Sequence, residues 1–327
     1  MPDFIDKYIR AGKSIPLFYY IRETLFNLIP RSLLARRRKR ILRGWEQRPD
    51  ADEIRERVDF YCPLKEPFPL SDNAVALKDI RPGKFLSRYA YDAQRSLRYW
   101  PGDVKVDFQH GDIWENPDTP TLMKGRRLDG KNEGNAVILN LDRIRHFLRP
   151  KDTVPFEEKI PKLFFRGDIF NKPARIRFFE QWADNPLFDL GDTCPHTPSR
   201  WAARPVSVPE HFKYRFILAL EGYDVASALQ WIMASGCVPV MTRPTVEGWL
   251  MHSRLVPGKH YIEIAPDFSD VGEKIAYYAA HPDEAEAIAR ESRRWAERFF
   301  NPERERIISL LVAERYLSLA QQNPRRP

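Results

Sequence analysis

Hydrophobic and polar positions in the second half of the chain follow the pattern of an α/β protein. Continuous apolar runs predict buried strands at 163–165, 214–220, 237–241 and 260–265. Helical patterns accompany them at about 173–184, 226–234, 270–280, 283–299 and 302–320. The strand–loop–helix–strand succession over 214–241 is a βαβ unit, which requires a parallel sheet. We therefore predict an α/β fold.

The first half of the chain gives a weaker pattern. Short apolar runs predict strands at 105–108, 121–123 and 136–141, with turn-rich segments between them. Residues 150–161 contain three prolines and many charges, which is typical of a domain boundary. We predict three parts: a basic amphipathic extension over 1–48, an N-terminal domain over 49–155, and a C-terminal domain with terminal helices over 156–327.

Charge is distributed unevenly along the 327 residues. The net charge is +8, and residues 1–48 alone hold twelve Lys or Arg against four Asp or Glu. The remainder has 41 basic and 41 acidic residues, which cancel. A neutral body argues against a protein that coats nucleic acid over its whole surface. The excess positive charge therefore indicates one local basic segment near the N-terminus.

That basic segment is predicted to be a helix over residues 31–45. At helical spacing Leu34, Ile41 and Trp45 share one face, and five consecutive basic residues occupy 36–40. Such a helix can lie on an anionic membrane surface. A helix that only packs against its own domain is an open alternative. The preceding apolar segment, 15–29, is too short and too polar to span a bilayer.

Metal and disulfide chemistry find no support in the sequence. Cys62, Cys194 and Cys237 are far apart and lack metal-ligand spacing, which favours a reducing compartment. The one DxD sequence, Asp50-Ala51-Asp52, lies in a charged linker without a preceding strand. We expect no metal and no cofactor.

Two loops follow predicted strands, where ligands bind in open α/β sheets. The first carries Arg166, Gly167 and Arg175, whose guanidinium groups suit a diphosphate unless local carboxylates already pair with them. The second carries Asp224 at a predicted helix N-terminus, where free N–H groups favour phosphate. Asp224 could equally serve only as the helix N-cap. The pattern predicts a phosphate-bearing ligand of open identity, with Glu221 or Glu247 available to ribose hydroxyls.

Several motifs in order resemble the family 90 glycosyltransferases. KLFFRG at 162–167 and the stretch 213–241 match the family, while 111–126, 245–249 and 260–288 resemble its bacterial lipopolysaccharide-core branch. The resemblance spans roughly 80–317. It implies a GT-B architecture, in which two Rossmann-like domains face each other across a cleft. It also implies inversion at the anomeric carbon without an essential metal, and a UDP-sugar donor bound mostly by the C-terminal domain.

The resemblance also assigns donor-site roles. Arg166 and Arg175 would neutralise the diphosphate, and the pocket would be shaped by Gly222, Asp224 and Ser227. Eukaryotic members have an arginine where this chain has Ala228, a contact that Arg243 could supply instead.

For the catalytic base we prefer Asp112, which follows Gly111 in a predicted turn. Asp107, in a predicted strand, and His110 are rivals for this role. Lys124 and Arg126 could hold an anionic, lipid-linked oligosaccharide acceptor. The expected enzyme is cytoplasmic and peripheral to the inner membrane, with no nucleic acid partner. The competing hypothesis is a non-enzymatic protein, associated with membrane or nucleic acid, that retains the fold.

Overall fold

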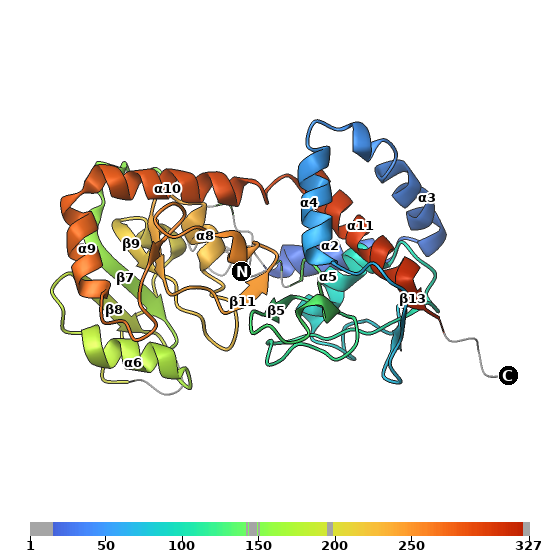
Figure 1. Ribbon diagram of the computed structural model, residues 1–327, viewed down its shortest axis with the longest axis horizontal. Coiled ribbons are helices and arrows are strands. Elements are labelled where there is room, and N and C mark those ends of the chain that lie inside the picture. Colours follow the sequence, from blue (N-terminus) through green and yellow to red (C-terminus); the bar gives the residue numbers. More distant parts are fainter. Residues whose placement is uncertain (1–15, 142, 144–148, 150, 195–198, 323–327) are drawn as a thin grey trace. The chain divides into compact units, whose positions relative to one another are not determined.

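The computed structural model describes residues 16–141, 143, 149, 151–194 and 199–322 (Figure 1). Chain contacts group these residues into two compact units. We call residues 149, 151–194, 199–244 and 250–300 the sheet unit. The mixed unit comprises residues 16–141, 143, 245–249 and 301–322. This division differs from the predicted domain ranges, because two later segments of the chain are grouped with its first part.

The sheet unit is built on one five-stranded sheet with the order β12-β10-β9-β7-β8. Its strands are β7 (Ile160–Gly167), β8 (Phe188–Asp192), β9 (Tyr214–Leu218), β10 (Val238–Met241) and β12 (Ile262–Glu263). Every neighbouring pair is parallel. The predicted α/β class with a parallel sheet is therefore confirmed.

Alternate residues of these strands form the core of the sheet unit. Leu163 and Phe165 of β7 lie in one buried cluster with Phe216 and Leu218 of β9. The same cluster includes apolar residues of α6 (Pro173–Trp182), α9 (Val271–Ala280) and α10 (Pro282–Glu297). The unit also contains α7 (Val208–His211), α8 (Leu229–Met233), η3 (Phe156–Glu158) and η4 (His252–Arg254).

The mixed unit contains longer helices and short paired strands. Its helices are α2 (Pro16–Asn27), α3 (Arg31–Ile41), α4 (Ala51–Tyr61), α5 (Ser87–Leu97) and α11 (Pro302–Leu319), with η1 (Trp45–Gln47) and η2 (Glu133–Asn135). Its strands pair two by two: β1 (Phe68–Pro69) with β13 (Ala320–Gln321), β2 (Val75–Ala76) with β3 (Lys105–Val106), β4 (Thr121–Met123) with β6 (Ala136–Ile138), and β5 (Gly125–Arg127) with β11 (Val246–Gly248). Among its described residues these strands do not join into a second Rossmann-like sheet.

The basic helix predicted over 31–45 exists as α3 but ends at Ile41, and its apolar residues Leu34 and Ile41 pack inside the mixed unit. Leu34 is fully buried in a small core with Phe26, Tyr99 and Leu310. Ile41 packs against the same core. None of the helices in the described part of the chain is long and apolar enough to cross a membrane.

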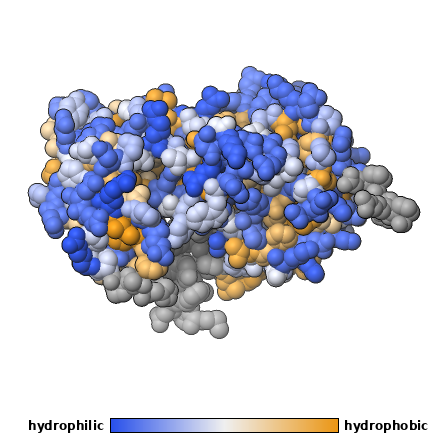
Figure 2. All heavy atoms as spheres, turned by 60° about the horizontal axis from the view of Figure 1, so that its bottom comes forward, coloured by the Kyte–Doolittle hydropathy of each residue, from blue (hydrophilic) through white to orange (hydrophobic). Residues whose placement is uncertain are grey.

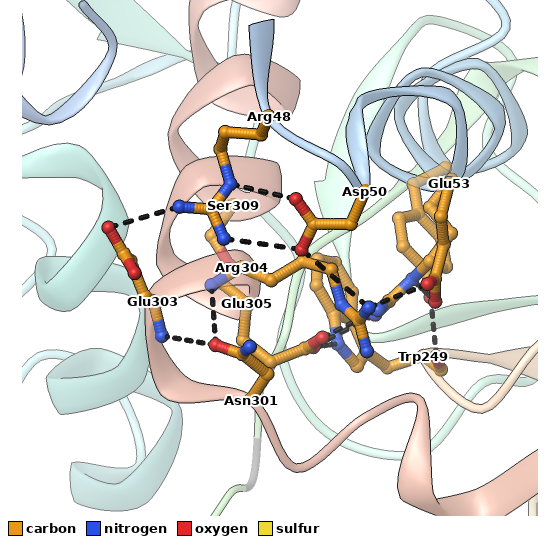
Figure 3. A network of polar contacts seen from close by, with 11 residues as sticks. Arg48, Asp50, Glu53, Trp249, Asn301, Glu303, Arg304, Glu305 and Ser309 are labelled. Carbon is orange, nitrogen blue, oxygen red and sulfur yellow. Dashed lines mark hydrogen bonds and ion pairs between the residues drawn. The ribbon is translucent and has the colours of Figure 1, made fainter. Parts of the chain in front are cut away.

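A polar network fixes α11 to α4, although the two helices are far apart in sequence (Figure 3). Arg57 is fully buried, and its Nη1 and Nη2 donate to the carboxylate of Glu305 at 2.5 and 2.8 Å. The indole of Trp249 donates to the same carboxylate at 2.6 Å. Although burial opposes the charge of Arg57, its contacts with Tyr61 and Glu305 raise its pKa. At the helix end, Arg304 pairs with Glu53 at 2.6 Å.

Replacing Glu305 by leucine should lower the free energy of unfolding by about 3–5 kcal/mol, because a buried guanidinium would lose its counter-charge. The matched control is Glu303→Leu in the same helical turn, where the carboxylate is 69% exposed. That control should change stability by less than about 1 kcal/mol. Urea unfolding of both variants measures the difference, and equal losses would contradict the assigned role of Glu305.

Candidate functional site

The strand order of the sheet unit creates a topological switch point between β7 and β9. From β7 the chain passes to β8 on one side, and then returns to β9, β10 and β12 on the other side. In open α/β sheets the loops diverge at such a point and leave a crevice at the carboxyl ends of the strands. The sequence supplies two of its predicted ligand loops there, one after β7 and one after β9.

Arg175, on α6, connects these two loops. Its Nη1 donates to the main-chain oxygen of Asp168 at 2.9 Å, and its Nη2 donates to that of Leu220 at 2.7 Å. Both acceptors are neutral, and no ion pair within the described ranges includes Arg175. Burial lowers the pKa of this guanidinium to about 10, with Asp168 acting in the opposite direction. A cation that is partly desolvated and lacks a bound carboxylate attracts an anionic ligand.

Gly222 and Lys172 lie directly beside Arg175. A β-carbon added to Gly222 would stand 3.5 Å from Nη2 of Arg175 and 3.7 Å from the Lys172 side chain. The Nζ of Lys172 donates to the carboxylate of Asp168 at 2.7 Å and lies 5.4 Å from the ring centre of Tyr223. Gly222 is exposed, and its lack of a side chain leaves open the space directly beside the guanidinium. Sequence reasoning named Arg175 and Gly222 separately, and the fold brings them together.

Arg166 is held differently. Its Nη2 donates to the carboxylate of Asp189 at 2.6 Å, and Tyr214 donates its hydroxyl to the other oxygen at 2.6 Å. The guanidinium of Arg166 lies over the ring of Phe164, whereas that of Arg175 lies over Phe165. Adjacent strand residues point to opposite faces. The two guanidinium groups therefore lie on opposite faces of β7, and Arg166 already has the local carboxylate considered as its alternative partner.

The loop after β9 differs from its predicted form. Helix α8 begins at Leu229 instead of about 226, and Ala228 occupies the N-cap position without a side-chain cap. The alternative role considered for Asp224, as the helix N-cap, is therefore wrong. The loop before the helix contains a backbone turn, in which the Gly222 N–H donates to the carbonyl of Asp224 at 3.0 Å. Asp224 is 8% exposed, and Ser227 is exposed.

Arg243 and Gly167 also lie near the carboxyl edge of the sheet. Arg243 follows β10 and pairs with Glu263, at the end of β12, at 3.5 Å. Gly167 is the last residue of β7. At five residues, α8 offers little helix dipole, so the positive side chains carry most of the attraction for an anion.

A second polar cluster surrounds Asp112 in the mixed unit. Gly111 has a φ of 98°, which a residue with a side chain rarely adopts, and this turn leaves the Asp112 side chain 38% exposed. The Nζ of Lys124 lies 3.3 Å from Asp112 Oδ1 and 3.3 Å from the hydroxyl of Tyr89. His110 packs against the Tyr89 ring at 6.0 Å. Lys124 therefore contacts the predicted base and is itself buried.

Tyr89 was missed in the sequence because it belongs to no motif. Its only local signal is its place on the buried face of α5.

The other site residues predicted in the mixed unit are buried and make contacts within the unit. Asp107 is buried and accepts hydrogen bonds from the backbone N–H and the hydroxyl of Ser71. Glu247 is fully buried on β11, directly opposite Arg126 on β5. Arg126 donates to the carbonyl of Phe60 at 2.7 Å, and burial lowers the pKa of its guanidinium. Asp107, Glu247 and Arg126 therefore present little of their side chains to a ligand.

Comparison with known proteins places this arrangement in a family. The model of "Glycosyl transferase family 90" matches residues 136–327. The O-glucosyltransferase LpsA of Dichelobacter nodosus is 37% identical over 92% of this chain and 95% of its own length. Protein O-glucosyltransferase 2 of Danio rerio is 29% identical over 41% of this chain and 28% of its own length. Protein O-glucosyltransferase 3 of Homo sapiens is 25% identical over 51% of this chain and 34% of its own length.

The family match covers the whole sheet unit as described, including both loops at the switch point, and the relative from Dichelobacter nodosus matches almost from end to end. The chain belongs to glycosyl transferase family 90.

Proposed function

We propose that this glycosyltransferase moves a hexose from a UDP-sugar to a lipopolysaccharide core or a related surface glycan, with inversion and without a metal. The observation that carries the proposal is the guanidinium of Arg175 at the β7–β9 switch point. Among the residues that the structure describes, it donates only to main-chain carbonyls, at 2.7 and 2.9 Å, and it lies beside the exposed Gly222. A nucleotide diphosphate supplies the negative charge that this group lacks. The resemblance to family 90 favours UDP as the nucleotide.

The positive charge of Arg175 would also assist the transfer reaction. When the bond between the sugar and the diphosphate breaks, negative charge grows on the leaving phosphate. Positive groups already fixed at that position stabilise the transition state, because they need not reorganise as the charge develops. Arg175 is fixed by the two carbonyls, and Lys172 is fixed by Asp168 at 2.7 Å. These side chains offer cationic assistance that requires no metal ion.

Asp112 is the proposed general base. An inverting transfer needs one group that removes the proton of the acceptor hydroxyl as its oxygen attacks the anomeric carbon. Asp112 fits because its carboxylate is partly exposed and is oriented by Lys124 at 3.3 Å. Asp107 fits less well, because it is buried and bonded to Ser71.

The acceptor and the location are proposed from the relatives and from the charge pattern. The relative from Dichelobacter nodosus is named an O-glucosyltransferase, which favours glucose as the hexose and a hydroxyl as the acceptor. The basic segment 31–45 would hold the enzyme at the anionic cytoplasmic face of the inner membrane, close to a lipid-linked acceptor. A non-enzymatic role is the alternative, and it predicts no response to UDP.

Replacing Arg175 by methionine should weaken UDP binding at least tenfold, because the diphosphate would lose its central counter-charge while most of the packing volume remains. The matched control is Arg177→Met on the same helix, where the guanidinium is exposed and bonds to the carbonyl of Pro266. Calorimetric titration with UDP measures both affinities. Equal affinity in the two variants would remove Arg175 from the donor site.

Replacing Asp112 by asparagine should reduce transfer at least a hundredfold and leave UDP affinity nearly unchanged, because only proton removal is lost. Glu115→Gln, an exposed carboxyl in the same segment, is the matched control and should retain activity. Product formation from a UDP-hexose is followed by mass spectrometry. Near-normal turnover in the Asp112 variant would exclude Asp112 as the base.

A further inference from the structure

Helix α2 leaves most of its aliphatic residues exposed. It buries Tyr19, Glu23 and Phe26 against its own unit, and Glu23 is only 1% exposed. Its aliphatic residues and Phe18 are exposed, together with Arg22 and Thr24. A helix at the surface of a globular protein normally turns its apolar stripe inward, so an exposed row of large aliphatic side chains is unusual.

The buried face of α2 is fixed to α5 by polar contacts. The Tyr19 hydroxyl donates to Asp92 Oδ1 at 2.8 Å, and Arg95 forms an ion pair with Glu23. Arg95 also lies over the ring of Phe26, 4.4 Å from its centre. These contacts determine which side of the helix faces outward.

The exposed face of α2 forms a continuous apolar stripe. Leu17, Ile21, Leu25 and Leu28 follow one another at spacings of three or four residues, and Phe18 lies beside them. These side chains are 47–72% exposed. On the face drawn in Figure 2 most of the surface is hydrophilic, and exposed apolar side chains gather in a few patches. A contiguous apolar stripe of this kind marks a binding surface.

Next along the chain, Ile29 and α3 form a basic groove. Leu33, 51% exposed, and Ile29 form its apolar floor together with Leu34. Arg36, Arg37 and Arg40 line the same groove, whose volume is about 350 Å³. No acidic residue lines it, so three guanidinium groups stand beside an apolar surface. This combination matches the boundary between lipid phosphates and acyl chains.

We propose that α2 and α3 together form the membrane-binding surface of this protein and that its occupant is an anionic bilayer. The stripe of α2 enters the acyl boundary, and the arginines of α3 contact lipid phosphates. The inference rests partly on the proposed function, which supplies the membrane location. It differs in assigning the contact with the acyl chains to α2. In the sequence this contact was predicted for Leu34, Ile41 and Trp45. Leu34 and Ile41 pack inside the unit instead, and Trp45 lies outside α3, in η1.

Charge argues against a second copy of this chain as the occupant. In a two-fold symmetric contact the same patch faces itself, so the arginines of both copies would be brought close together without acidic partners. An anionic bilayer neutralises the same residues. Each Lys or Arg near such a surface adds to the attraction.

The test is co-sedimentation of the full chain with vesicles of 30% phosphatidylglycerol in phosphatidylcholine. The Ile21→Ser/Leu25→Ser variant should bind at least tenfold more weakly at any salt concentration. The Arg36→Gln/Arg37→Gln/Arg40→Gln variant should match it at low salt and differ little from the wild type at high salt. Leu86→Ser, another exposed leucine of the mixed unit (49%), is the control and should bind normally.

UDP affinity in each variant separates this inference from the proposed function. Retained UDP affinity shows that the variants are folded, and if the wild type fails to bind UDP, vesicle binding still tests α2 by itself. Unchanged vesicle binding in the Ile21/Leu25 variant would overturn the proposal. Absence of wild-type binding, or a dimer in sedimentation equilibrium that the Ile21/Leu25 substitutions dissociate, would also overturn it.

Discussion

The bridge that Arg175 makes between the loops after β7 and β9 is the interaction on which the rest of the account depends. It fixes a guanidinium at the point where the strand order reverses, and it uses main-chain oxygens of Asp168 and Leu220 to do so. Carbonyl acceptors orient the group without neutralising it. The positive charge therefore stays available to a ligand in a way that the charge of Arg166, paired with Asp189, does not.

The mixed unit is held together mainly by its helices and by a buried ion pair. Among the described residues its short strands pair only two by two, so sheet formation contributes little to its cohesion. Helix packing and the buried pair between Arg57 and Glu305 connect segments that lie at opposite ends of the chain. This framework also carries the turn at Gly111, where a positive φ exposes the neighbouring Asp112.

Much of the sheet unit could be predicted from the sequence, because buried parallel strands give continuous apolar runs such as 214–220 and 237–241. Prolines at the first turn placed the starts of α10 and α11 equally well. The mixed unit was harder to predict. Its strand pair β1–β13 joins Phe68 to Ala320, and no local pattern reveals a contact over that sequence distance.

The candidate site was predictable residue by residue but not in its arrangement. Arginines and a glycine after strands indicated an anion site, yet which arginine was free of a carboxylate depended on Asp189 in the neighbouring strand. The helix expected at 226 starts at Leu229, and residues 222–224 before it form a turn closed by a backbone hydrogen bond that no local pattern revealed. Glu247 looked available in the sequence and is fully buried opposite Arg126.

The most direct test observes the guanidinium of Arg175 itself. In a ¹⁵N-arginine sample, the Nε–H signal that disappears in Arg175→Lys identifies this residue. If a diphosphate binds at the switch point, this signal shifts during titration with UDP and saturates with the calorimetric affinity. If UDP binds while this signal stays in place, the donor is bound elsewhere and the account given for the site is wrong.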